Sequence, residues 1–79
     1  MRVAAFARIR EIVGTGAFER CVCDDARAED LWRELAAEFP ELAALRASTR
    51  LVINGGVVDG AHVLHDGDEL ALLPPFGGG

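Results

Sequence analysis

The residues best suited to chemistry stand at the end of the sequence, where Gly77, Gly78 and Gly79 follow Pro74-Pro75-Phe76. A terminal carboxylate, with a pKa of about 3.5, is ionised at neutral pH and can attack a phosphorus atom of ATP. Glycines have no Cβ, so they pass through a narrow channel and let another protein's active site approach the backbone. We therefore interpret these residues as a tail that is presented to an enzyme as a substrate.

The alternative is a frayed chain end, which is common in proteins. Against it, the glycines end the sequence and follow almost directly on the last expected strand. Pro74 and Pro75 fix φ and stiffen the exit from the domain. Six residues from Pro74 reach roughly 20 Å when extended, which is enough to enter the cleft of a partner.

The other candidate motifs fit structural roles. Gly14-Thr15-Gly16 begins like a dinucleotide-binding loop, but Glu19 stands where the third glycine is required. The segment 66–69 lacks the frame of a calcium-binding loop. His62 and His65 have no nucleophile arrangement that the sequence can place, and we expect them on the surface. We expect no catalytic residue, no metal site and no bound cofactor.

Cys21 and Cys23 are the only cysteines. On a strand, residues two apart point to the same face. A disulfide between them would be strained, and two thiols alone do not complete a zinc site. We expect reduced cysteines packed beside a strand; a redox or metal role is the alternative.

Composition narrows the function classes further. The 79 residues make one domain with a net charge of −5, and all eight basic residues are arginines. An acidic domain without a basic cluster is a poor ligand for nucleic acid, so we expect protein partners with basic surfaces. Without lysine, the chain has no Schiff-base group and no internal acceptor for isopeptide bonds. There is no apolar run of about 18 residues and no signal peptide, so we expect no membrane and a cytoplasmic location.

One helix is clearly indicated among the elements that must position the tail. Apolar residues recur with a 3.6-residue period at Ala28, Leu31, Trp32, Leu35, Ala36 and Phe39. Asp24 or Asp25 is the expected cap, and Pro40 should end the helix. A further short turn over 41–46 should turn Leu42 and Leu45 inward.

Strand-like segments surround this helix, with expected ranges of 2–7, 18–23, 51–53, 57–58 and 70–73, and a turn of helix follows the first of them. The order of strand, strand, helix, strand, short strand and strand predicts an α+β fold. The β-grasp, a mixed sheet wrapped around one main helix, fits this order best. We expect a β-grasp domain over residues 1–75 and a flexible glycine tail over 76–79.

Motifs along the whole chain resemble a known family, the ubiquitin-like sulfur-carrier (small) subunits of molybdopterin synthase. They are Phe6-Ala7-x-x-Arg10-Glu11-x-x-Gly14, Asn54-Gly55, Asp66-Gly67-Asp68-Glu69 and Pro74-Pro75-x-x-Gly78-Gly79. The related thiamine sulfur carriers look shorter at the front and usually lack the two prolines and the Phe-Ala-x-x-Arg-Glu stretch. Gly77 departs from the pattern, because the family often has another small residue there.

The resemblance implies a mechanism in which the chain carries sulfur and does no catalysis. An E1-like enzyme would adenylate the Gly79 carboxylate with ATP, and a sulfur donor protein would convert the acyl-adenylate to a thiocarboxylate. The tail would then enter the large subunit of molybdopterin synthase, in a heterotetramer, and pass sulfur to cyclic pyranopterin monophosphate. The catalytic residues would lie on the large subunit.

For the partner contact we expect the sheet face and rim nearest the tail, with Phe6, Leu73, Pro74, Pro75 and Phe76 as the binding residues. One helix can cover only one face of the sheet, and strand alternation lets Phe6 and Leu73 point away from it. Other functions stay open. The chain could carry sulfur for thiamine, cysteine or a similar pathway, or be a ubiquitin-like modifier joined through Gly79 to lysines of other proteins. A pure binding module would leave the tail unexplained.

Overall fold

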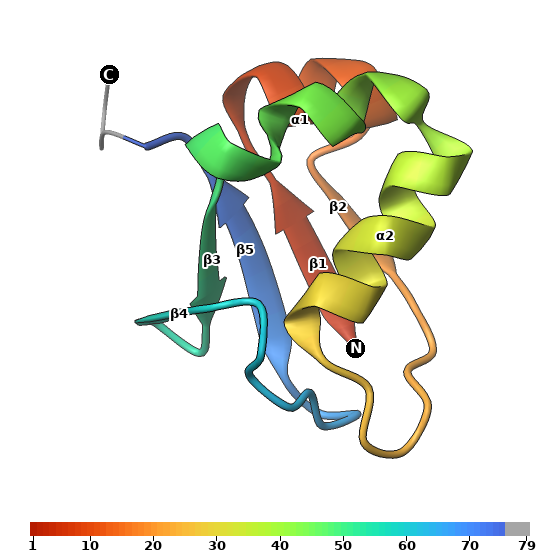
Figure 1. The fold of residues 1–79 in the computed structure, drawn as a ribbon, viewed down its shortest axis with the longest axis vertical. Coiled ribbons are helices and arrows are strands. Elements are labelled where there is room, and N and C mark those ends of the chain that lie inside the picture. The colour runs from red at the N-terminus through yellow and green to blue at the C-terminus, as the bar shows by residue number, and fades with distance from the viewer. Residues whose placement is uncertain (76–79) are drawn as a thin grey trace.

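The computed structural model describes residues 1–75, which form a five-stranded sheet with the helices packed on one face (Figure 1). The strand order is β2-β1-β5-β3-β4; β1 and β5 are parallel, and the other pairs are antiparallel. The strands are β1 (Arg2–Ala5), β2 (Ala17–Glu19), β3 (Arg50–Ile53), β4 (Gly56–Val58) and β5 (Glu69–Leu73). The helices are α1 (Ala7–Val13), α2 (Ala28–Glu38) and the 3-10 helix η1 (Pro40–Ser48). The predicted mixed sheet around one main helix is confirmed.

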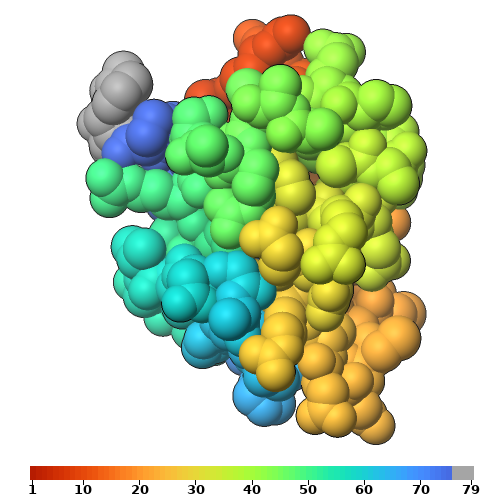
Figure 2. All heavy atoms as spheres, in the orientation of Figure 1, coloured from red at the N-terminus to blue at the C-terminus, as the bar shows by residue number. Residues whose placement is uncertain are grey.

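Alternate residues of the three central strands point toward the helices and supply six of the buried core residues. They are Val3 and Ala5, Leu51 and Ile53, and Leu70 and Leu72. The helices supply six more, and Met1 and Leu64 complete the core; the six are Ile9, Ala28, Leu31, Trp32, Leu35 and Leu42. Trp32 and Leu35 are thus in the core as predicted, and Leu45 packs against it. In the space-filling view, α2, η1 and the segment 56–64 form a continuous surface over this side of the sheet (Figure 2).

The N-terminal half differs from the prediction in the lengths of its elements. The first strand ends at Ala5, because Ala7 has φ 52° and starts α1. The expected turn of helix is therefore a seven-residue helix, which ends at Gly14 with φ 89°. The expected strand 18–23 was too long at its C-terminal end. β2 pairs with β1 only as far as Glu19 opposite Arg2, so the residues beyond Arg20 have no strand to pair with.

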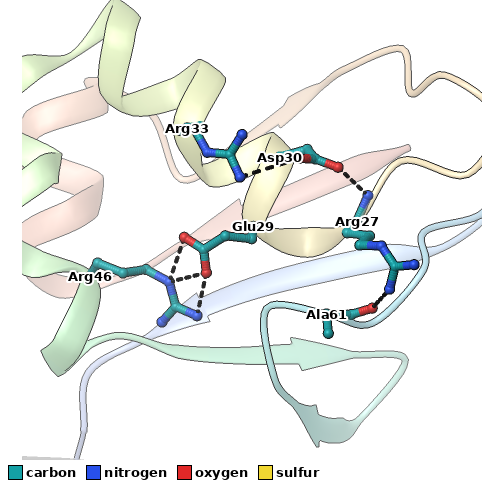
Figure 3. Close-up of polar contacts among 6 residues, drawn as sticks. All are labelled: Arg27, Glu29, Asp30, Arg33, Arg46 and Ala61. Carbon is teal, nitrogen blue, oxygen red and sulfur yellow. Dashed lines mark hydrogen bonds and ion pairs between the residues drawn. The ribbon is translucent and has the colours of Figure 1, made fainter.

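The predicted cap of the main helix was also wrong. Asp24 and Asp25 lie in a turn before the helix, and Arg27 is the N-cap residue with an extended backbone. The Arg27 backbone N–H donates to Asp30 Oδ2 at 2.9 Å, and the Arg27 side chain donates to the Ala61 carbonyl at 2.7 Å (Figure 3). The carboxylates of the first turn, Glu29 and Asp30, sit at the positive end of the helix dipole. The helix ends before Pro40, as predicted.

A second polar contact joins three segments around Glu29. Arg46 Nε in η1 donates to Glu29 Oε1 at 3.0 Å, and a terminal guanidinium nitrogen of Arg46 forms an ion pair with the same oxygen, also at 3.0 Å (Figure 3). The Glu29 backbone N–H donates to the Gly60 carbonyl at 2.9 Å. A Cβ added at Gly60 would overlap Glu29 Oε1, so the glycine leaves room for this arrangement.

Two of the motifs noted in the sequence meet at the turns far from the tail. Asn54 and Gly55 form the β3–β4 turn with φ 47° and 88°. The Asn54 side chain donates to Asp68 Oδ1 at 3.1 Å, and its carbonyl accepts from the Glu69 N–H at 3.1 Å. Asp68 Oδ2 accepts from the His65 backbone N–H at 2.9 Å. This backbone hydrogen bond, with help from Asn54, lowers the pKa of the Asp68 carboxyl. The motif residues thus hold the β3–β4 turn to the start of β5.

Candidate functional site

The root of the tail is anchored by the centre of the sheet. β5 lies between β1 and β3 and pairs with both along its length. Its last residue, Leu73, pairs with Arg50, and Pro74 and Pro75 leave the sheet from there. The chemically important residues predicted from the sequence, Phe76 and Gly77 to Gly79, lie outside the described residues.

A shallow apolar groove of about 100 Å³ lies beside this root. Phe6 and Ile9 from the start of α1, Leu45 and Thr49 from around η1, and Pro74 and Pro75 line it. Phe6 is 45 % exposed and has an extended backbone after β1. Because Ala5 pairs with Leu72 in parallel, Phe6 follows at the level of Leu73. Four of the five residues expected to bind a partner are therefore neighbours, and their role in binding stays a prediction.

Sequence reasoning missed an apolar row on the sheet face that the helices leave uncovered. Residues at one level of the five strands pair in succession across it: Ala17, Ala4, Ala71, Val52 and Val57. We call these five residues the outer row. Val57 is 68 % exposed, and the other four are half-buried. The alternation of Val52 with the buried Leu51 and Ile53 is the signal that could have identified this face.

The two cysteines do not line the groove at the tail root. Cys21 and Cys23 are free, exposed and outside any strand, so the expectation that they pack beside a strand was wrong. The loop that follows β2 and the end of β5 lie at opposite ends of the molecule (Figure 1). His62 and His65 are exposed, as predicted. Within residues 1–75, no three His, Cys, Asp or Glu side chains gather as a metal site would require.

We expect Cys21 and Cys23 to be dispensable for loading sulfur onto the tail. Replacing both with serine should leave loading unchanged, because sulfur is expected on the terminal carbonyl carbon and both thiols are exposed outside the groove at the tail root. The measurement is the intact mass of the variant after reaction with its adenylating enzyme, ATP and sulfur donor. A double variant that folds but gains no sulfur would point to a persulfide route through the thiols.

Comparison with known proteins identifies the family. Residues 3–79 match the model of the ThiS family. This chain belongs to the ThiS family. The chain is 37 % identical to the molybdopterin synthase sulfur carrier subunit of Escherichia coli K12, and the alignment covers all of this chain and 99 % of that protein. The resemblance inferred from the sequence motifs is thereby confirmed.

Solved structures of related proteins have the same fold as this ThiS-family chain. Small archaeal modifier protein 1 of Haloferax volcanii superposes with a TM-score of 0.84 at 27 % identity, covering 96 % of this chain and 97 % of that one. Subunit 1 in a complex of subunits 1 and 2 of the molybdopterin-converting factor from Helicobacter pylori 26695 matches at 25 % identity and a TM-score of 0.68. That match covers 99 % of this chain and 96 % of the other. The β-grasp assignment is therefore confirmed. Among residues 1–75, no helix is long and apolar enough to cross a membrane.

Proposed function

We propose that this ThiS-family protein carries sulfur as a thiocarboxylate on Gly79 and donates it to cyclic pyranopterin monophosphate in molybdopterin biosynthesis. The observation that supports this most is the placement of the tail root: a central strand delivers it to a rim of apolar residues. A carrier needs this combination, because the same end must fit an activating enzyme and then a sulfur acceptor. The relative from Escherichia coli bears the name of such a carrier and spans the same length.

The proposed loading has two steps, both on partner proteins. In the first, a Gly79 carboxylate oxygen attacks the α-phosphorus of ATP on an E1-like enzyme, forming an acyl-adenylate and releasing pyrophosphate. In the second, the outer sulfur of a persulfide on a donor protein attacks the acyl carbon and AMP leaves, which gives an acyl disulfide. A further thiol then attacks the donor sulfur of this disulfide, forms a new disulfide with it and releases the thiocarboxylate. The chain itself contributes the carboxylate and the surface that docks it.

The proposed sulfur acceptor is bound by a separate large subunit. The Helicobacter pylori relative is described in complex with subunit 2 of its converting factor. By analogy we propose a heterotetramer of two carriers and two large subunits, with the catalytic residues on the large subunit. The domain of residues 1–75 would stay outside the partner's cleft, and residues 76–79 would enter it. Free, exposed thiols at Cys21 and Cys23 fit the reducing cytoplasm as the compartment.

A second candidate function is protein modification. The structural relative from Haloferax volcanii is named a modifier protein, and its fold matches this chain over nearly the full length. In that role Gly79 would form an amide with a lysine of a target. The chain has no lysine, so it could not be extended into a chain of copies through its own side chains. A carrier for thiamine or cysteine synthesis would use the same thiocarboxylate with a different acceptor.

Intact mass spectrometry of the protein from its own cells tests the proposal. If the protein is a sulfur carrier, part of the purified protein should have a higher mass, because one oxygen of its terminal carboxylate is replaced by sulfur. This heavier form should convert cyclic pyranopterin monophosphate to molybdopterin when the large subunit is added. A thiocarboxylate that is inactive in this assay would move the protein to another sulfur pathway. Recovery of Gly79 joined to lysines of other proteins would favour the modifier.

We expect Phe6→Asp and Phe76→Asp each to weaken binding to the large subunit at least about tenfold, because apolar aromatics at an interface often carry much of the binding energy. Phe6 is the N-cap of α1 and its side chain makes no cap hydrogen bond, so aspartate there should favour the helix start and spare the fold. Calorimetric titration measures the affinity.

The matched control for these two variants is Ala37→Asp. Ala37 is exposed on α2, on the helix-covered side of the sheet. The substitution therefore adds the same negative charge at a site away from the tail. Ala37→Asp should bind like the unchanged protein. If all three variants bound the large subunit with the affinity of the unchanged protein, the docking surface would lie elsewhere.

A further inference from the structure

Arg50 stands apart from the other arginines of the chain. Five arginines pair with carboxylates: Arg2 with Glu69, Arg8 with Glu11 and Glu41, Arg20 with Glu38, Arg33 with Asp30, and Arg46 with Glu29. Arg27 donates to the Ala61 carbonyl. Within residues 1–75, only Arg10 and Arg50 have neither an ion pair nor a side-chain hydrogen bond. Arg10 lies in the last turn of α1, where a cation suits the helix dipole, and its side chain lies against Gly16.

The position of Arg50 links it to the root of the tail. It is the first residue of β3 and is exposed, whereas Leu51 and Ile53 are buried among the helices. By alternation it lies on the uncovered sheet face with Val52 of the outer row. It pairs directly with Leu73, the last residue of β5 before the two prolines. A cation that has no partner among residues 1–75 therefore stands between the outer row and the exit of the tail.

Covering this face would place strong chemical demands on a partner. A guanidinium that is removed from water without an acceptor costs much more free energy than an apolar contact returns. A planar, five-donor guanidinium is best satisfied by a carboxylate, which it binds with two parallel hydrogen bonds. The partner surface that covers the outer row and Leu73 must therefore be apolar, with an acidic side chain opposite Arg50.

We propose that Arg50 is a specificity-determining residue: it pairs with a carboxylate of the large subunit when that subunit covers the outer row and receives the tail. This inference rests on the proposed function, since it takes the large subunit as the occupant of the face. The pair fixes the orientation of the carrier, because apolar contacts of the outer row alone would allow sliding. It also rejects partners that present a basic residue at this point, although the carrier as a whole is acidic.

Calorimetric titration of the large subunit from the same organism with three full-length variants tests the inference. Arg50→Glu should weaken binding by roughly 30-fold or more, as expected when a desolvated charge pair becomes a repulsive one. Arg50→Met keeps an apolar stem in the strand and should weaken binding about tenfold. The matched control is Arg33→Glu, which makes the same change of charge at an exposed position of α2. It should stay within about threefold of the unchanged protein, because exposed ion pairs contribute little.

Charge reversal on the partner completes the test. Individual Asp→Arg and Glu→Arg variants of the large subunit should include one that binds the Arg50→Glu carrier better than the unchanged carrier. Arg50→Glu affinity within threefold of the unchanged protein would overturn the inference, and so would an equal loss in Arg33→Glu. In either case, sulfur detected on Gly79 would leave the proposed function standing. An unchanged carrier that neither binds the large subunit nor acquires sulfur would overturn both.

Discussion

Deleting Gly79, or Gly78 and Gly79 together, is expected to abolish sulfur transfer and to leave the domain folded. In the proposed mechanism, the carboxylate of a shortened chain would fall short of the position at which the adenylating enzyme is expected to act, and no acyl-adenylate should form. The hydrophobic core is built from residues between Met1 and Leu72, and none of them belongs to the tail. The denaturation midpoint should therefore stay that of the full chain.

The measurement is molybdopterin formation in a reconstituted assay with adenylating enzyme, sulfur donor and large subunit. Gly77→Ala is the matched control, because it alters the tail by one methyl group and keeps its length and its terminal diglycine. This variant should remain active, as the resemblance to carriers with another small residue at this position implies. Molybdopterin formed by a truncated chain would contradict the carrier mechanism.

The largest expected effect on stability comes from Leu35→Ala. Leu35 is fully buried between α2 and the sheet, and its truncation should cost about 2–5 kcal/mol because it leaves a cavity in the core. That is a large share of the roughly 5–15 kcal/mol that a small domain has. Urea unfolding followed by Trp32 fluorescence measures the change. Glu34→Ala, its exposed neighbour on α2, should shift the midpoint little. An unchanged urea-unfolding midpoint for Leu35→Ala would mean that this side of α2 does not pack into the hydrophobic core.

The elements with strong local signals were predictable from the sequence. The stripe through Leu31 and Leu35 fixed both the position of α2 and the side that it buries. Pro40 marked its end, because proline disfavours helical backbone in the residue before it. The turn at Asn54 and Gly55 followed from residue types that tolerate positive φ.

The errors lie where tertiary pairing decides the outcome. β2 stops at Glu19 because β1 begins at Arg2, and no local property of residues 20–23 shows this. The start of α2 is held by the backbone N–H groups of Ala28 and Glu29, which donate to the His62 and Gly60 carbonyls, contacts between residues far apart in the sequence. Likewise, the tail was evident from composition and the resemblance. The groove beside it was not, because three separate segments form it.

The contact among Glu29, Arg46 and Gly60 has a consequence for evolution. A Cβ at position 60 would need the space that Glu29 Oε1 occupies, so a mutation there would shift the Glu29 carboxylate, and Arg46 would have to follow it to keep the ion pair. With the carboxylate displaced, the ion pair would hold less firmly, and selection for an arginine at position 46 would weaken. The residues at positions 29, 46 and 60 should therefore tend to change together during evolution. Among descendants of this sequence, an acid at 29 and an arginine at 46 should persist together while position 60 stays glycine, and should be lost together after it changes.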